Sequence, residues 1–423
     1  PPIPGNDIYL SLDYGLQKLT SDLLNGKRGA AVAIDPNTGE ILAFVSNPSF
    51  DPNPFITGIS SREYKALQQD PDMPLYNRAL QGQYPPGSSI KPIEGLAGIH
   101  YGIMGWDSSI YDPGYFSLPG DSHKFRDWKK SGHGNVNLHK SVVESVDTYY
   151  YKLSYQLGID RLHDWMTRFN FGSKTGIDLP GEKTGVYPST EWKMKTYKKA
   201  WLPGETISVS IGQGYFLATP LQIANGIAML AGDGQHLTPH LLKKSTGAEH
   251  VTPIEKPDGK IQYNGNPNDW QRMHLAMEDV VKKGTAHNIY TPTYRIAGKT
   301  GTAQVKSIAQ GKRYNEAALD SRHWDHGWFV GFAPVENPQI AIAVIVENGR
   351  HGGWVAPIVR KMMDYWLIDK IKKPIVPPSP EELVKINAEK QAAKLQRAAL
   401  VLSGKPIISK PNTAKLPAVG GAD

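Results

Sequence analysis

The strongest constraint on the fold is that strand patterns gather at the two ends of the chain. Near the start, "RGAAVAID" and "EILAFVS" flank the turn "PNTG", which is typical of a β-hairpin. Near the end, "YRIAGKTGTAQV", "GWFVGFAP" and "QIAIAVIVEN" have strand character, and "VENP" joins the last two. Helical patterns and Gly/Pro loops dominate from about residue 51 to 290. We therefore expect an α/β (α+β) fold, in which an antiparallel sheet of N- and C-terminal strands packs with helices and carries an inserted, mainly helical subdomain.

Local signals place two helices within this plan. "TPLQ" at Thr219–Gln222 is a capping box with Pro220 at the first helical position, so a helix is predicted through Ile223 to Leu230. A final amphipathic helix is expected over Pro357–Ile371.

Three segments follow from these patterns. Residues 1–13 read as a linker from an N-terminal anchor or pedestal region that the sequence does not include. Residues 14–371 form one large domain, with its helical insertion at about 51–290. Residues 372–423, which begin with the Pro-rich "KKPIVPPSP", are predicted to be a mobile basic tail.

Charge and composition exclude several classes of function. The net charge is +7, but the segment from Ile371 onward holds nine Lys or Arg against four Asp or Glu, so the body is left near +2. No basic stripe is interleaved with aromatic residues, and we expect no nucleic-acid partner. The absence of cysteine excludes disulfides and thiolate chemistry. The longest obvious apolar run, Ile340–Val346, is too short to span a membrane.

The stretch "YPPGSSIKP" at Tyr84–Pro92 contains two adjacent serines and one lysine. Only Ser88 lies three residues before Lys91, and positions i and i+3 share one face of a helix, whereas Ser89 would point nearly opposite. The preceding "PPG" blocks a helix, so Ser88 is expected near a helix N-terminus, where the helix dipole favours a developing alkoxide. Ser88 is thus the candidate nucleophile, although an N-cap serine would fit the same position.

A second motif, "KTGT" at Lys299–Thr302, lies on a predicted strand. Gly301 has no side chain to obstruct a ligand, which suits an extended substrate that pairs along a strand edge. A phosphate-binding loop ending in "GKT" would need glycine at position 293, where Thr293 stands, so that reading fails. A strand that merely turns at a glycine remains the alternative for this motif alone.

The third motif is Ser145-Val146-Asp147, which is almost uninformative by itself. The order S-x-x-K, S-x-[ND], K-[ST]-G, on helix, loop and strand, is however the pattern of penicillin-recognising serine enzymes. Taken together, the three motifs predict a serine acyl-transfer site.

The sequence here resembles the class B penicillin-binding transpeptidases of the cell wall, in particular those of rod-shape elongation. The resemblance runs from about Pro1 to Asp369, and Asp147 in place of asparagine is typical of this subgroup. It rests on the segments "NDIYLSLD", "NPSFDPN", "YPPGSSIKP", "RDWKKSGHG", "ESVDTYYYKLSYQLGIDRL", "TISVSIGQGYFLATPLQIA", "GKTGTAQV" and "VGFAPVENPQIAIAVIVENG".

The resemblance implies a peptidoglycan D,D-transpeptidase that crosslinks stem peptides through a serine acyl-enzyme and is inhibited by β-lactams. Ser88 would attack, neutral Lys91 would accept its proton, and Ser145 would relay protons. Lys299, Thr300 and Thr302 would hold the substrate's carboxylate, with the Ser88 and Thr302 N–H groups as oxyanion hole. Asp147 would accept the substrate's amide N–H.

Location and partners follow from the same resemblance. The expected location is the periplasmic face of the inner membrane, with an anchor in a preceding segment. The expected partners are a membrane glycosyltransferase and the elongation complex, besides stem peptides and β-lactam antibiotics. A serine β-lactamase and a β-lactam sensor domain remain alternatives, and penicillin turnover or stem-peptide crosslinking would separate the three.

Finally, the resemblance implies a zinc site in close relatives, made of two aspartates, a histidine and a cysteine. Asp112, Asp127 and His133 match three ligands, but Val146 stands at the cysteine's position. Without the family, acidic loops with a histidine are more often solvated or salt-bridged than metal-bound. Valine offers no lone pair, so we expect zinc to bind weakly or not at all, and no cofactor to be needed for catalysis.

Overall fold

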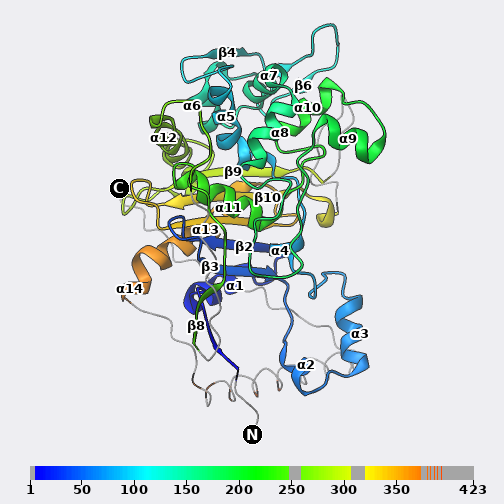
Figure 1. Cartoon of the computed structure of the whole chain (residues 1–423), viewed down its shortest axis with the longest axis vertical. Helices are drawn as coiled ribbons and strands as arrows, with labels where there is room; N and C mark the ends of the chain where they lie inside the picture. Colours follow the sequence, from blue (N-terminus) through cyan, green and yellow to red (C-terminus); the bar gives the residue numbers. More distant parts are fainter. Residues whose placement is uncertain are drawn as a thin grey trace. The chain divides into compact units, whose positions relative to one another are not determined.

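The computed structural model describes residues 5–246, 259–305 and 320–372, together with residues 379, 382, 385, 388 and 392. A five-stranded antiparallel sheet lies at the centre, in the order β3-β2-β11-β10-β9 (Figure 1). Strands from the two ends of the sequence therefore pair side by side, and the expected fold class is confirmed. Its strands are β2 (Gly29–Ile34), β3 (Ile41–Asn47), β9 (Ala297–Ala303), β10 (His326–Ala333) and β11 (Ile340–Val346).

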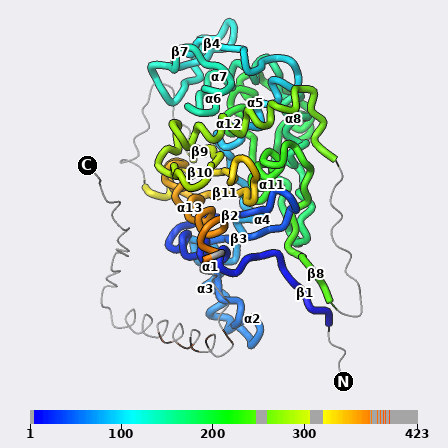
Figure 2. Tube along the Cα trace, turned by 90° about the vertical axis from the view of Figure 1, so that its left-hand side faces the viewer, coloured from blue at the N-terminus to red at the C-terminus, as the bar shows by residue number. Residues whose placement is uncertain are grey.

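The inner strands are buried on both faces, which explains their almost continuous apolar sequence. Every residue of β2 and β11 is buried. Helix α11 (Pro220–Ala231) packs on β2 and β11, while α13 (Gly352–Asp364) packs on β10 and β11 from the opposite side (Figure 2). Among the strands that the structure describes, β9 pairs only with β10 and so forms one edge of the sheet.

The inserted region lies mainly beyond the β9 edge, whereas α2 and α3 lie beyond the β3 edge (Figure 1). Helix α5 runs through its centre, and nine of its ten residues are buried. The helices of the region are α2 (Asn53–Thr57), α3 (Ser61–Gln69), α4 (Arg78–Gln81), α5 (Lys91–His100), α6 (Leu138–Val143), α7 (Asp147–Leu157), α8 (Ile159–Thr167), α9 (Thr190–Tyr197), α10 (Pro203–Val209), α11 and α12 (Asn268–Lys282).

Short strands also occur in this region, where the sequence pattern showed only helices and loops. Strands of two to four residues are too short for an alternating pattern to stand out. They form two small sheets, β4 (Ser109–Asp112) with β7 (Gly134–Asn137) and β5 (Tyr115–Phe116) with β6 (Phe125–Arg126). A third pairs β1 (Asp7–Leu10) with β8 (Leu242–Thr246).

The capping box is confirmed, because Thr219 and Gln222 bond each other's backbone N–H at the start of α11. The expected helix over Pro357–Ile371 is wrong in its start, since α13 begins at Gly352 and Pro357 lies inside it. Proline cannot donate to the carbonyl four residues earlier, and the Asn288 side-chain amide donates to that Gly353 carbonyl at 2.9 Å instead. The helix then continues through a π-helical turn, Tyr365–Asp369, into α14 (Lys370–Lys372).

The chain divides into two compact units, Pro1–Pro374 and Ile375–Asp423. The tail predicted over 372–423 lies almost wholly outside the described residues, so its mobility remains a prediction. Within the described ranges, no helix combines the length and the apolar character that crossing a membrane requires.

Candidate active site

The residues around Ser88 approach β9 very closely, and glycines make this approach possible. Gly87 has a φ of +58°, and a Cβ there would lie 2.4 Å from the Thr302 carbonyl oxygen. Gly212 has a φ of +71°, and its Cβ would lie 2.1 Å from the Gly87 carbonyl oxygen. The Gly87 N–H donates to the Gly212 carbonyl at 2.9 Å. Replacing either glycine by a residue with a side chain would push the turn that carries Ser88 away from β9.

The two adjacent serines have different environments. Ser88 lies on a 3₁₀ turn, Gly87–Ile90, that leads directly into α5, and it lines a pocket. Ser89 is fully buried and its hydroxyl donates to the Pro86 carbonyl at 2.9 Å. Of the two serines, only Ser88 lines the pocket.

Two fully buried lysines meet at Ser145. Lys91 Nζ donates to the Ser145 carbonyl at 2.9 Å and lies 3.4 Å from its Oγ. Lys299 Nζ donates to Ser145 Oγ at 2.8 Å. Burial, and then the charge of Lys91, hold the pKa of Lys299 well below its usual value, although Asp147 opposes this. Ser145 thus connects the two lysines, in a backbone conformation with a φ of +56°.

Asp147 contacts Lys91 in addition to facing the pocket. Its Oδ1 lies 2.6 Å from Lys91 Nζ, a contact that the sequence motif did not indicate. Asp147 begins α7, and Asp127 Oδ2 accepts the Asp147 and Thr148 N–H groups at 2.7 and 3.1 Å. The Asp127 carboxylate therefore caps the helix that carries Asp147.

The pocket has a volume of about 580 Å³ and brings the three motifs together. Its floor is the β9 edge, where Thr300, Gly301 and Thr302 line it. Sequence reasoning missed its other walls, although "RDWKKSGHG" and "GQGY" contained a signal for two of these residues. The missed residues are Trp128, Ile211, Gln213, Thr285, Gln304, Asp325, His351, Gly352 and Gly353.

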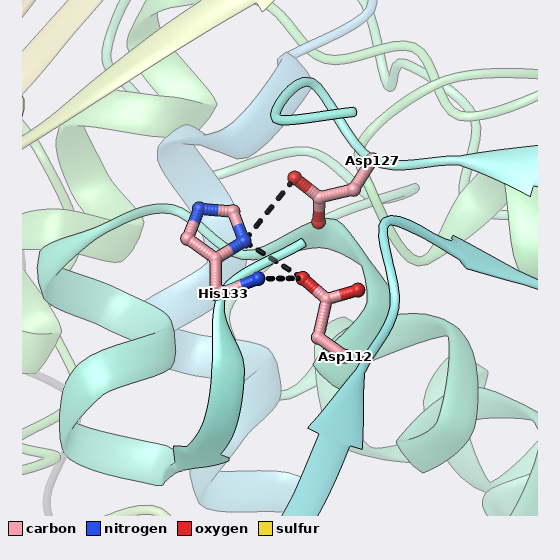
Figure 3. A group of neighbouring side chains, drawn as sticks. All are labelled: Asp112, Asp127 and His133. Carbon is pink, nitrogen blue, oxygen red and sulfur yellow. Dashed lines mark hydrogen bonds and ion pairs between the residues drawn. The ribbon is translucent and has the colours of Figure 1, made fainter. Parts of the chain in front are cut away.

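Asp112, Asp127 and His133 form a buried cluster in which their possible ligand atoms all lie within 4.8 Å of one another (Figure 3). His133 Nδ1 lies 2.7 Å from Asp112 Oδ2 and 3.5 Å from Asp127 Oδ1. The His133 backbone N–H also donates to Asp112 Oδ2 at 2.9 Å. Burial raises the pKa of Asp112, but the hydrogen bonds from His133 and Gly114 outweigh it, so that the pKa is lowered.

Among the described residues, this cluster offers three candidate ligands, whereas a structural zinc site usually has four. His133 Nε2 is buried, has no hydrogen-bond partner among the described residues and lies 3.9 Å from Glu144 Oε2. Asp127 Oδ2 is already engaged by the start of α7. Val146, fully buried, has no donor atom to supply. The cluster thus brings three candidate ligands together, the side chains of Asp112, Asp127 and His133.

Comparisons with known proteins agree on one family. The family described as penicillin binding protein transpeptidase domain matches residues 29–364. Peptidoglycan D,D-transpeptidase MrdA of Acinetobacter baumannii is 61% identical over 89% of this chain and 56% of its own length. The Escherichia coli K12 protein of the same name is 44% identical over 87% of this chain and 59% of its own length. The chain thus spans little more than half of these relatives.

Solved structures give the same result for the fold. Penicillin-binding protein 2 of Pseudomonas aeruginosa, in complex with WCK 5153, matches with a TM-score of 0.79 at 48% identity, over 87% of this chain and 80% of that one. The same protein from Helicobacter pylori, in complex with MreC, matches with a TM-score of 0.76 at 36% identity, over 86% of this chain and 64% of that one.

Proposed function

The chain belongs to the penicillin-binding protein transpeptidase family, and on this premise we propose that it is the catalytic part of a peptidoglycan D,D-transpeptidase. The observation that supports this most directly is the convergence of Ser88, Lys91, Ser145 and Lys299 beside the edge strand β9, three residues of which line the pocket. The substrate class is a stem peptide that ends in two D-alanines and lies extended along β9.

The reaction is an acyl transfer in two steps. The Ser88 Oγ attacks the carbonyl between the two D-alanines, the C–N bond breaks, and free D-alanine leaves with a proton. Lys91 takes the serine proton, and Ser145, which bonds both lysines, passes a proton to the leaving amine. The amine of a second stem peptide then attacks the ester, restores Ser88 and completes the crosslink.

Charge develops on the attacked carbonyl oxygen, and backbone donors stabilise it. The Ser88 and Thr302 N–H groups are the oxyanion hole in this proposal, and the close Gly87–Thr302 contact holds the two peptide units together. Lys299, with Thr300 and Thr302, holds the terminal carboxylate. The Asp147 carboxylate bonds Lys91 in the free enzyme. Because Asp147 also lines the pocket, its carboxylate accepts the amide N–H of the substrate once the substrate binds.

A β-lactam presents the same carboxylate beside a strained amide, so it acylates Ser88 and blocks the site. The test is intact-protein mass after incubation with benzylpenicillin, followed by peptide mapping of the adduct. One stable adduct on Ser88 is expected, together with crosslinking of stem peptides. Rapid hydrolysis of the penicillin would indicate a β-lactamase instead, and a stable adduct without crosslinking would indicate a sensor.

The location and the partners belong to the same proposal. Because peptidoglycan is crosslinked outside the inner membrane, the location we propose for the site is the periplasmic face of that membrane. The Helicobacter pylori protein was solved with MreC, and another similar chain, 33% identical with a TM-score of 0.74 over 87% of this chain and 64% of its own, belongs to a peptidoglycan synthase complex. These cases support a glycosyltransferase and elongation-complex proteins as partners. Zinc, with one ligand missing, is proposed to bind weakly or not at all.

A further inference from the structure

One carbonyl on the β9 edge is already hydrogen-bonded by a side chain of the pocket wall. Gln213 Nε2 donates to the Thr302 carbonyl oxygen at 3.0 Å. The assignment of nitrogen rather than oxygen at this position is fixed by chemistry, because the amide oxygen would face another acceptor. Gln213 follows Gly212, which packs on Gly87, and its backbone N–H donates to the Ser208 carbonyl at 3.1 Å. The loop that carries this glutamine is therefore firmly placed.

The Thr302 carbonyl faces the pocket rather than the sheet. Thr302 is paired with Gly327 of β10, and its carbonyl bonds Gln213, so it points away from β10. In a strand the N–H and C=O of one residue point to the same side, so both polar groups of Thr302 face the pocket. Gly87 closes one side of this carbonyl, since a Cβ there would lie 2.4 Å from the oxygen. Gln213, which lines the pocket, reaches the same oxygen with its side-chain amide.

An extended peptide that adds to the β9 edge needs this same carbonyl for its own N–H. We propose that Gln213 is a specificity-determining residue, whose amide competes with the substrate's backbone N–H for the Thr302 carbonyl. Binding of an extended chain then exchanges one hydrogen bond for another and gains little from it, whereas a ligand without such an N–H leaves Gln213 in place. This inference rests on the proposed acyl-transfer function.

The experiment compares two β-lactams by their second-order acylation rates, measured as adduct mass against time. Benzylpenicillin carries an amide N–H beside its β-lactam carbonyl, and imipenem carries a hydroxyethyl group there. Gln213→Met removes the donor and keeps the side-chain length. The ratio of the benzylpenicillin rate to the imipenem rate should rise about fivefold, the worth of a typical hydrogen bond.

Two further variants make this ratio interpretable. Gln213→Glu also removes the donor. Its negative charge acts on the carboxylates of both drugs, so this effect cancels in the ratio of the two rates. The ratio should therefore rise in this variant too, which keeps the test valid even if Gln213→Met folds poorly. Gln339→Met, in the exposed turn between β10 and β11, is the matched control and should leave the ratio unchanged. An unchanged or lowered ratio in both Gln213 variants overturns the competition. No acylation of the unsubstituted chain by either drug would instead overturn the proposed function.

Discussion

The two halves of the pocket are held by different means. On one side, Ser88 lies on a 3₁₀ turn, Lys91 on the buried helix that follows it and Lys299 on a sheet strand. Glycine contacts between main-chain segments set their separation. On the other side, Ser145 stands on a loop and Asp147 at a helix start. The side chain of Asp127 holds that helix start, and the two lysines bond the Ser145 hydroxyl.

This difference predicts how each half responds to substitution. Main-chain contacts survive the loss of one catalytic side chain, so changes on the first side should remove chemistry and spare the fold. On the second side, the groups that position the site also stabilise it, so changes should reduce activity and stability together.

The largest effect should come from the nucleophile, where the two serines provide a matched pair. Ser88→Ala should reduce acylation by benzylpenicillin by about 10³-fold or more, because binding alone forms no acyl-enzyme. Ser89→Ala should keep labelling and lose about 1 kcal/mol of stability, since its hydroxyl bonds the Pro86 carbonyl. Peptide mapping measures the labelling of each variant, and thermal unfolding measures its stability. An adduct on Ser89 would contradict the assignment.

Substitution of Lys299 tests whether a residue on the first side can support acylation while it reduces the stability of the fold. Lys299→Met should slow acylation by carboxylate-bearing β-lactams by about 10- to 100-fold, the worth of a charged hydrogen bond. Ester analogues of the same drugs should be affected much less. If the acylation rate fell equally for the acids and their esters, Lys299 would not bind the drug's carboxylate. The substitution would then act only through the neighbouring Lys91.

The same variant should change how stability depends on pH. Burial and the charge of Lys91 depress the pKa of Lys299, so the unfolded chain binds this proton more readily than the folded chain. Folding stability therefore rises as pH approaches the ordinary lysine value of 10.5 and is reduced at lower pH. Lys299→Met should raise the free energy of unfolding at neutral pH and flatten that rise, as denaturant titrations at several pH values would measure. A destabilised variant would mean that its bond to Ser145 dominates.

On the second side, Asp127→Ala should lower stability and activity together. The substitution leaves the Asp147 and Thr148 N–H groups without the carboxylate that accepts them. Loss of a helix cap lowers the free energy of unfolding by about 1–2 kcal/mol. Acylation should slow severalfold, because Asp147 is then held less firmly. Asp160→Ala is the control, because that carboxylate accepts the Thr190 N–H at 2.9 Å on another helix. It should not change acylation. Equal acylation in both variants would remove the proposed link between cap and catalysis.

The first side was also the easier one to predict from the sequence. The choice of Ser88 over Ser89 depended only on local helical spacing, and the strand carrying Lys299 had a local pattern. Burial of the neighbouring helix on all sides and the edge position of β9 agree with that expectation. Local rules suffice to place each motif on its own helix or strand, whereas the approach of the Ser88 turn to β9 depends on glycine contacts between distant segments.

The second side depends on contacts between distant segments, which local patterns do not contain. The ion pair of Asp147 with Lys91 joins residues 56 apart. On the first side, the bond of Gln213 to the β9 residue Thr302 joins residues 89 apart and was equally invisible to local patterns. The cluster of Asp112, Asp127 and His133 was predicted only through the family resemblance. The start of α13 was missed because Pro357 resembles a helix start, while the Asn288 side chain that accommodates it lies far away in sequence.

The smallest expected effect concerns the ligand that the second side lacks. Val146 is fully buried and adjoins Asp147, whose N–H bonds the Asp127 carboxylate. Val146→Cys would add a thiolate to two carboxylates and an imidazole, which together form a four-ligand set suited to zinc. Metal analysis should find well under one zinc per chain before the substitution and close to one after it. The melting temperature should rise with zinc and fall again with a chelator, because metal binding stabilises the folded state. Val146→Thr, of similar shape but without a thiolate, should show neither change. Stoichiometric zinc in the unsubstituted chain would refute this prediction, and it would mean that three protein ligands and a water suffice to hold the Asp147 side of the pocket.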